Sequence, residues 1–462
     1  MNSPVPLAPT PARLAPSLAI QLQHTARCVQ GVAQGRSLTE LLPTVPAELR
    51  PGVQALTFQV LRQFGTARAL VAQLAPRKPD PTMHALLCSA VALLLHEPTD
   101  ADVDAAEAAA PTGFVPYAAH TVVNQAVDAA RQQRSTQRQA AFVNACLRRF
   151  LRERTALQAA VANDLEALWN HPRWWIEWMQ RDHPDHWQAV LNANNQPGPM
   201  TLRVNRRLTD PAKYQQALKT VGLAAQPIGE DGLTLAQPQP VDRLPGFADG
   251  LCSVQDAAAQ LAAPLLLAGR DWPATARVLD ACAAPGGKTA HLLELADLDL
   301  LALDVDPRRC ERVTATLQRL HLRAVVQVGD AARPADWWDG QLFDAILLDA
   351  PCTASGIVRR HPDVRWLRRE SDVAQLAAVQ QQLLDALWPL LKPGGRLVYA
   401  TCSVFLAEGS MQLASFLERH TDAVSEPAPG HLLPGNAGAP APVRDNEPGG
   451  HDGFFYARID KR

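Results

Sequence analysis

The stretch Asp280-Ala-Cys-Ala-Ala-Pro-Gly-Gly-Lys-Thr289 decides the fold of this chain. The apolar run Arg277-Val-Leu-Asp280 predicts a short strand that ends in an acid, and residues 288–295 predict the start of a helix. Between them lies a turn made by residues 285–287, a proline and two glycines. Strand, glycine turn and helix are typical of a doubly wound α/β sheet, in which ligands bind at the carboxyl ends of the strands.

Strands and helices alternate downstream of this stretch, which favours a parallel sheet. The patterns predict strands at 300–304, 323–328, 343–349, 396–402 and 454–459, helices at 307–320 and 372–391, a turn at 392–395 and a loop at 427–450. We therefore predict an α/β domain over residues 251–462, built on a mostly parallel, doubly wound sheet of the Rossmann type.

The first part of the chain has a helical pattern. Residues 1–19 are rich in proline and alanine and are expected to form a disordered leader. Residues 20–168 predict an all-α bundle, with a central helix at 82–96 and others at 121–130 and 138–152. We expect the last of these to bury Phe142, Ala145, Cys146 and Phe150.

Residues 169–250 predict a small α+β module, with strands at 200–204 and 233–235 and a helix at 211–220. Five tryptophans occur between Trp169 and Trp187, at helical spacings that favour a place in the core over a role in base stacking. His183 and His186 lack further metal ligands nearby, so we interpret them as part of a surface turn.

Composition limits the possible partners. The formal net charge of -2 argues against binding polyanions through net charge, so a nucleic-acid surface must be a local patch. Two patches exist: residues 131–154 hold seven arginines against one acid, and residues 359–369 hold five against one. The first patch could equally be a solvated helix face.

The cysteines and the apolar runs indicate the compartment. Eight cysteines without any Cys-x-x-Cys pair favour reduced thiols in the cytoplasm over a zinc site or a disulfide framework. The longest apolar run, residues 86–95, is too short to cross a bilayer. We therefore expect a cytoplasmic protein with neither a membrane partner nor a metal ion.

Four acids stand at or just beyond predicted strand ends: Asp280, Asp304, Asp330 and Asp349. An acid at the end of the second strand suits a ribose diol, because a carboxylate accepts from both hydroxyls. Cys282 occupies the position where an ATPase P-loop requires its first glycine, so a phosphate cradle is excluded. A ligand without phosphates, such as S-adenosylmethionine, fits this turn.

Cys352 follows the strand at 343–349, and Cys402 ends the strand at 396–402. Because neighbouring parallel strands end at the same edge of a sheet, we expect both thiols at one side of the pocket. A thiolate is a strong nucleophile and a good leaving group, which covalent activation of an inert ring requires.

Residues 280–289, 346–369 and 396–404 resemble the motifs of RNA cytosine-C5 methyltransferases, which are class I, Rossmann-type enzymes that use S-adenosyl-L-methionine. Asp349-Ala-Pro-Cys352 with Thr401-Cys-Ser403 is specific to them, because the DNA enzymes carry only the Pro-Cys cysteine. The helical part resembles the NusB antitermination factor, an RNA-binding bundle. Together with residues 451–457 this is similar to the bacterial RsmB (Fmu/Sun) group, which acts on 16S ribosomal RNA.

The resemblance implies a role for each matched residue. Cys402 would attack C6 of cytosine, Cys352 would assist loss of the C5 proton and release of the enzyme, and Asp349 would lie beside both cofactor and base. Asp304 would bind the ribose and Asp330 the adenine amino group. The cofactor methionine would be cradled by Cys282, Ala283, Ala284, Pro285, Gly286, Gly287 and Lys288.

The second arginine patch gains a purpose from this resemblance. Its members would hold RNA phosphates around an extruded base: Arg359, Arg360, Arg365, Arg368 and Arg369. The expected partner is 16S rRNA, naked or in early small-subunit assembly, bound by a monomer, with no DNA partner. Two alternatives stay open: a tRNA cytosine-C5 methyltransferase, and a non-catalytic RNA-binding or ribosome-assembly factor.

Overall fold

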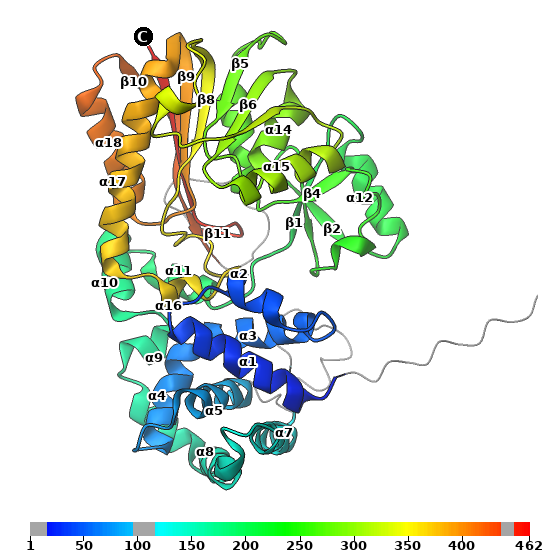
Figure 1. Cartoon of the computed structure of the whole chain (residues 1–462), viewed down its shortest axis with the longest axis vertical. Helices are drawn as coiled ribbons and strands as arrows, with labels where there is room; N and C mark the ends of the chain where they lie inside the picture. Colours follow the sequence, from blue (N-terminus) through cyan, green and yellow to red (C-terminus); the bar gives the residue numbers. More distant parts are fainter. Residues whose placement is uncertain (1–15, 96–115, 436–447) are drawn as a thin grey trace, which may run out of the picture. The chain divides into compact units, whose positions relative to one another are not determined.

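The computed structural model describes residues 16–95, 116–435 and 448–462. The chain divides into two compact units, Met1–Leu168 and Trp169–Arg462, and each is described by itself (Figure 1). Most of the predicted leader, and the middle of the predicted loop at 427–450, lie outside the described residues. No helix in the described ranges is both long and apolar enough to cross a membrane.

The described elements of the first unit are all helical. They are α1 (Leu18–Ala33), α2 (Leu38–Leu41), η1 (Leu42–Thr44), α3 (Arg50–Arg62), α4 (Phe64–Leu74), α5 (Pro81–Leu94), α7 (Ala119–Gln132), η2 (Gln137–Gln139), α8 (Ala140–Val161) and α9 (Leu165–Trp169), the last ending one residue inside the second unit. Asp80 caps α5 by accepting from the backbone of Thr82 and Met83, and Pro81 occupies its first turn. Helix α5 packs against α1, α3, α4, α7 and α8, which confirms the predicted central helix.

Helix α8 presents a different face to the core from the predicted one. Its buried side chains include Val143, Cys146, Leu147 and Phe150. Phe142 is 37% exposed, and Ala145 is also exposed, so the predicted burial of these two residues is wrong. The correct stripe recurs at positions i, i+3, i+4 and i+7, the spacing of one helix face.

The second unit contains a four-stranded sheet of order β2-β3-β1-β4. Its elements are β1 (Thr201–Val204), α12 (Pro211–Thr220), β2 (Ala225–Ile228), β3 (Gly232–Leu235), η3 (Val241–Arg243) and β4 (Cys252–Val254). The predicted strands at 200–204 and 233–235 and the helix at 211–220 are confirmed, whereas β2 and β4 were not foreseen. Strand β4 lies beyond residue 250, so the sheet extends past the predicted edge of the module.

Two tryptophan-rich helices, α10 (Arg173–Asp182) and α11 (Trp187–Asn194), belong to a separate core. Trp175 is fully buried there among Val358, Val404 and Phe405, and four further tryptophans pack around this cluster. The expectation that these rings are core residues is therefore confirmed. The core they enter contains the segments around the two predicted catalytic cysteines.

The main sheet has eight strands in the order β11-β10-β12-β9-β8-β5-β6-β7. They are β5 (Arg277–Asp280), β6 (Asp299–Asp304), β7 (Val325–Val328), β8 (Phe343–Asp349), β9 (Leu391–Thr401), β10 (Ala423–Pro434), β11 (Pro448–Gly449) and β12 (Phe454–Lys461). Strands β5 to β9 pair in parallel, and β12 runs antiparallel between β9 and β10. The predicted mostly parallel sheet is confirmed.

Helices cover both faces of this sheet (Figure 1). Leu266, Leu292 and Val313 of α13 (Ala262–Leu267), α14 (Gly287–Leu295) and α15 (Pro307–Arg319) pack on one face. On the other face, α17 (Glu370–Leu387) supplies Leu383, Leu384 and Leu387, and α18 (Ser410–Arg419) supplies Phe416. The remaining elements are short: η4 (Ala259–Leu261), η5 (Pro334–Asp336), α16 (Val364–Leu367), η6 (Trp388–Leu390) and η7 (Leu406–Glu408).

Two segments that were predicted as a loop and a turn fall within the bounds of strands. Strand β10 covers residues 423–434, where a loop was expected from residue 427, and it pairs with β12 despite an irregularity between Glu426 and Gly430. The turn expected at 392–395 falls inside the bounds of β9, but the pairing with β8 passes from Leu391 directly to Arg396, so these four residues bulge out of the ladder. Gly394 has a φ of +74°, as the predicted turn requires. In both strands the proline- and glycine-rich residues coincide with the break in register, and the residues on either side of them pair with the neighbouring strand.

Candidate active site

The acids and thiols predicted from the sequence meet at the carboxyl edge of the parallel strands. Asp280, Asp304 and Asp349 are the last residues of β5, β6 and β8, and Cys402 directly follows β9. Asp330 stands two residues beyond the end of β7. The parallel register therefore gathers onto one edge residues that are more than a hundred positions apart in the chain.

The glycine turn forms the floor of this site. Gly286 has a φ of +95°, and a Cβ there would lie 3.1 Å from Cα of Val313, so both conformation and packing require glycine. The backbone N–H of Ala284 donates to Oδ2 of Asp304 at 3.1 Å. The hydroxyl of Thr289, in the first turn of α14, donates to Oδ2 of Asp280 at 2.6 Å.

Asp280 is a buried acid in an acidic surrounding. Burial raises its pKa to about 7, the Thr289 hydrogen bond opposes this, and the charges of Asp349 and Asp304 add to the rise. Its Oδ1 atom is buried and has no hydrogen-bond partner within the described part of the chain. An unsatisfied buried acceptor at this edge of the sheet favours binding of a donor.

Cys352 and Cys402 lie together, as predicted. Their Sγ atoms are 3.4 Å apart. The hydrogen bond to Cys402, followed by burial, raises the pKa of Cys352 well above its usual value, so Cys352 keeps its proton at neutral pH. The backbone N–H of Gly356 donates to the carbonyl of Cys402 at 3.0 Å, which ties the two cysteine segments together.

Lys288 contacts a group that the sequence did not indicate. Its Nζ donates to Oδ2 of Asp349 at 2.6 Å and lies 5.3 Å from the centroid of the Phe454 ring. Burial alone would lower the pKa of this lysine, but the neighbouring anions, Asp349 first, outweigh burial and raise it. The partners are 61 positions apart, so sequence spacing carried no signal of the pair.

The arginine segment is more internal than the sequence implied. Arg359 is 2% exposed and pairs with Asp452, and Arg365 is fully buried, with guanidinium contacts to Asn170, Asn194 and Asn195. Internal acceptors thus hold both groups, and the expected phosphate contacts of Arg359 and Arg365 do not fit their positions. Sequence reasoning missed the partner acids because they lie far away along the chain.

The other three arginines of this segment lie nearer the surface. Arg360 bridges Asp452 and Asp256. Arg368 donates to the carbonyls of Thr353 at 3.0 Å and Cys352 at 3.2 Å, which braces the segment that carries the thiol. Arg369 is exposed at the start of α17. Among the five, Arg369 presents its side chain most freely to a polyanion.

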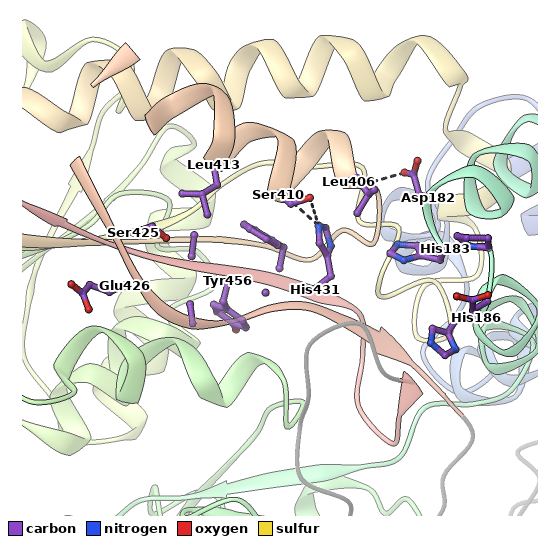
Figure 2. Close-up of a pocket in the computed structure, with 16 residues that line it drawn as sticks. Asp182, His183, His186, Leu406, Ser410, Leu413, Ser425, Glu426, His431 and Tyr456 are labelled. Atoms are coloured by element: carbon purple, nitrogen blue, oxygen red, sulfur yellow. Dashed lines mark hydrogen bonds between the residues drawn. The ribbon is translucent and has the colours of Figure 1, made fainter. Parts of the chain in front are cut away.

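A separate cavity of about 580 Å³ is lined by the turn at 182–186, by helix α18 and by strands β10 and β12 (Figure 2). Its wall includes His183, His186 and His431, together with Asp182 and Ser410. The described residues contain no group of three or more histidine, cysteine or acidic side chains arranged to hold a metal ion. Here the turn at 183–186, expected at the surface, is partly internal, because His183 is 5% exposed.

The edge with the acids fits S-adenosylmethionine better than a nucleotide phosphate. Its polar groups are mainly carboxylates, which repel phosphate but attract the ammonium and sulfonium charges of this ligand. Each Asp304 oxygen accepts one backbone N–H, from Ala284 or Asp306, and Oδ2 also lies 3.4 Å from a guanidinium nitrogen of Arg309. Oδ1 therefore keeps a lone pair for a ribose hydroxyl. The unsatisfied oxygen of Asp280 adds a further acceptor.

Comparisons with known proteins show the family to which this chain belongs. The family model for 16S rRNA methyltransferase RsmB/F matches residues 269–460, and the model for the RsmF/B-like ferredoxin-like domain matches residues 171–242. Ribosomal RNA small subunit methyltransferase B of Vibrio cholerae is 39% identical over 94% of this chain and 95% of its own length. The protein of the same name in Citrobacter koseri is 40% identical over 94% and 96%.

A solved methyltransferase homologue from Pyrococcus horikoshii is 27% identical, covers 64% of this chain and 96% of its own, and has a TM-score of 0.53. Methyltransferases of this type use S-adenosyl-L-methionine. The matches extend over nearly the whole chain and include the segments that carry both thiols and the glycine turn. This chain belongs to the RsmB/F family of S-adenosylmethionine-dependent 16S rRNA methyltransferases.

Proposed function

We propose that this protein methylates C5 of a specific cytosine in 16S rRNA through a covalent bond between Cys402 and C6 of the base. The observation that carries the proposal is the 3.4 Å separation of the Cys352 and Cys402 sulfurs at the ends of neighbouring strands. Relatives named ribosomal RNA small subunit methyltransferase B support this substrate. An rRNA substrate would place the reaction in the cytoplasm.

The glycine turn and the strand-end acids would hold the cofactor. Residues 282–288 would enclose its methionine part, Asp304 would accept from the ribose hydroxyls, and Asp330 would accept from the adenine amino group. S-adenosylmethionine, when bound, supplies a methyl group on a positively charged sulfur. The buried carboxylates around the turn would favour this charge over a neutral or anionic ligand.

The two thiols would divide the work. The sulfur of Cys402 would form a bond to C6, and the displaced electron pair would make C5 nucleophilic enough to take the methyl group. Transfer of the C5 proton to water would then restore the C5–C6 double bond and expel Cys402 as a thiolate, and the S–H group of Cys352 would assist by hydrogen bonding to the departing sulfur. The raised pKa of Cys352 supports this division, because it keeps the Cys352 thiol protonated and able to donate a hydrogen bond to the Cys402 thiolate.

Asp349 would stabilise the ring during attack. Its carboxyl group would face N3 and the amino edge of cytosine, and a proton shared between this carboxyl group and N3 would neutralise the negative charge that attack on C6 places on the ring. The 2.6 Å contact from Lys288 fixes one of its oxygens, so the group is oriented before the base arrives. Arg369, beside this segment, would contact a phosphate next to the extruded base.

Trapping of the covalent complex tests the division between the cysteines. Purified Cys352→Ala and Cys402→Ala variants are incubated with S-adenosylmethionine and unmodified 16S rRNA, and RNA–protein adducts are counted on denaturing gels. We expect a stalled adduct only with Cys352→Ala, because that variant attacks C6 but releases slowly. An adduct formed by Cys402→Ala would overturn the assignment.

The two alternative functions give different outcomes. A tRNA methyltransferase would transfer labelled methyl groups to purified tRNA instead of 16S rRNA. A non-catalytic assembly factor would bind undermodified small subunits without any methyl transfer. The two thiols, Asp349 and the glycine turn lie at one edge of the sheet, which favours catalysis over the assembly role.

A further inference from the structure

The segment that follows Cys402 contains a buried acid that the mechanism above does not use. Glu408 ends η7 and is fully buried. The aspartates described above lie at the strand ends, whereas Glu408 contacts the two residues that directly follow the cysteines. Thr353 comes immediately after Cys352, and Ser403 comes immediately after Cys402.

The carboxylate of Glu408 binds both cysteine segments at once. Its Oε1 accepts from the backbone N–H of Thr353 at 2.8 Å, and its Oε2 accepts from the hydroxyl of Ser403 at 2.6 Å and from the hydroxyl of Thr353. Gln380 donates from Nε2 to Oε1 at 3.1 Å and to the carbonyl of Pro351 at 2.9 Å. Four donors thus converge on one buried carboxylate, and three of them belong to residues adjacent to a thiol.

The backbone of Glu408 is fixed as well. Its carbonyl accepts from the hydroxyl of Tyr399 at 2.8 Å and from that of Thr401 at 3.2 Å, both on β9. Burial raises the pKa of Glu408, while the bonds from Ser403 and Thr353 oppose this rise. A side chain held by so many partners cannot shift without moving the thiols.

The outer side of the same segment is anchored by the cavity wall (Figure 2). Asp182 accepts from the backbone N–H of Leu406 at 3.1 Å, and His183 Nε2 contacts the carbonyl of Val404 at 2.6 Å. The backbone N–H of Ser410 donates to Nε2 of His431 at 3.2 Å. Residues 404–410 are therefore fixed from outside, which leaves Glu408 as a rigid point inside.

We propose that Glu408 is a positioning residue that sets the separation of the Cys352 and Cys402 sulfurs. The proposal rests on the proposed roles of these thiols, and Glu408 would act through Thr353 and Ser403, the residues that follow them. Its carboxylate holds the residue after each cysteine, so it fixes where both thiols point. Misplacement of reacting groups by about 1 Å can cost roughly 100-fold in rate, so loss of this link would lower turnover.

Glu408→Leu and Glu408→Gln test the proposal. The amide of the conservative variant keeps an oxygen for the two N–H donors, and the rotating hydroxyls of Thr353 and Ser403 can accept from its nitrogen. We expect kcat to fall about 100-fold in Glu408→Leu and by less than about 10-fold in Glu408→Gln, with the KM for RNA within about threefold of the parent in both.

Thiol cross-linking reports on the geometry independently of methyl transfer. A mild disulfide-forming oxidant takes two electrons and two protons from the Cys352–Cys402 pair, and mass spectrometry of the linked peptides gives the rate. We expect this rate to fall at least about tenfold in Glu408→Leu, because the sulfurs no longer stand in contact. Gln412→Ala is the matched control: it removes a buried bond between α18 and α17 that touches neither cysteine segment.

Parental cross-linking and kcat in folded Glu408→Leu would overturn the proposal, as would a rise in KM with unchanged kcat. If Glu408→Leu does not fold, Ser403→Ala, which removes one donor, takes its place and is expected to show a smaller loss in the same direction. Failure of the proposed function alone looks different: the parent transfers no methyl group, yet its two thiols still cross-link faster than those of the Glu408 variant.

Discussion

At the scale of single residues, Asp280 is a buried acid whose two oxygens have different surroundings. Thr289 satisfies one oxygen, while the other is buried without a hydrogen-bond partner in the described structure. Burial, with the charges of Asp349 and Asp304, raises the pKa of Asp280 to about 7, so this group changes its charge near neutral pH. A carboxyl group in this state is ready to ionise when a cation arrives, which suits a pocket for a positively charged methyl donor.

This acid predicts a pH dependence of stability. The pKa of Asp280 rises from 3.8 to about 7 on folding, so the folded protein holds a proton that the unfolded chain releases between these values. Stability should therefore fall as pH rises through this window and level off above about pH 7. In Asp280→Asn this pH-dependent contribution to the free energy of unfolding is absent, because the amide does not titrate.

Thermal unfolding followed by tryptophan fluorescence measures the effect, because all ten tryptophans lie between Trp169 and Trp388, in the second unit. The melting temperature of Asp280→Asn relative to the parent should increase between about pH 5 and pH 7.5. A constant difference across this range would show that Asp280 ionises normally in the folded protein.

At the scale of elements, the small sheet is joined to the cofactor turn by buried charges. Arg203 of β1 forms two parallel bonds of 2.8 Å to Glu294 of α14, and its third nitrogen donates to the carbonyl of Gly287 at 2.8 Å. Arg319, at the end of α15, donates to the carbonyls of Phe247 and Cys252 at 2.7 and 3.0 Å. Two helices of the main sheet thus hold the module.

Breaking the first of these links should be costly. Arg203→Met leaves the carboxylate of Glu294 buried without its cation, and we expect a loss of roughly 3–5 kcal/mol in the free energy of unfolding of the second unit. The double variant Arg203→Met/Glu294→Leu removes both charges and should recover most of that loss. Urea unfolding followed by tryptophan fluorescence gives both values. A cost below about 1 kcal/mol for the single variant would contradict a structural role for the pair.

Elements differed in how far the sequence could predict them. Helix α12 and strands β5, β6 and β8 follow from local periodicity and were placed correctly. Strand β10 was missed, because its prolines and glycines indicate a loop while its pairing with β12 is set by residues 20 or more positions away. The same limit applies to the site: strand-end acids and thiols have local signals, whereas Lys288–Asp349 and Arg359–Asp452 are contacts of the folded chain.

At the scale of the whole molecule, net charge and local charge have opposite implications. The chain carries a formal charge of -2, yet the first unit exposes Arg131, Arg134 and Arg138 near the junction of α7 and α8. Arg134 and Arg138 form no ion pair within the described residues. We propose that this cluster binds RNA phosphates, which a net negative protein must contact through local patches.

The variant Arg131→Gln/Arg134→Gln/Arg138→Gln tests this role in the full chain. We expect the KM for RNA to rise about tenfold with kcat unchanged, and the slope of log affinity against log salt to fall by roughly 2–3, since each phosphate contact contributes about 0.7–0.9. Arg27→Gln/Arg36→Gln removes two exposed arginines of the same unit outside the cluster and serves as the control. Equal behaviour of the two variants would identify the cluster as a solvated face.

The small four-stranded sheet also limits how this protein can be recombined with its relatives. The two family models match residues 171–242 and 269–460. Strand β4, at 252–254, lies between the two matches and pairs with β1. A chimera cut at the borders of the first model would pair β1 with a β4 from another family member and separate Arg203 from its matched Glu294. A functional chimera must therefore take the small sheet, β4 and the facing residues of α14 and α15 from the same family member. We expect these parts to change together between relatives.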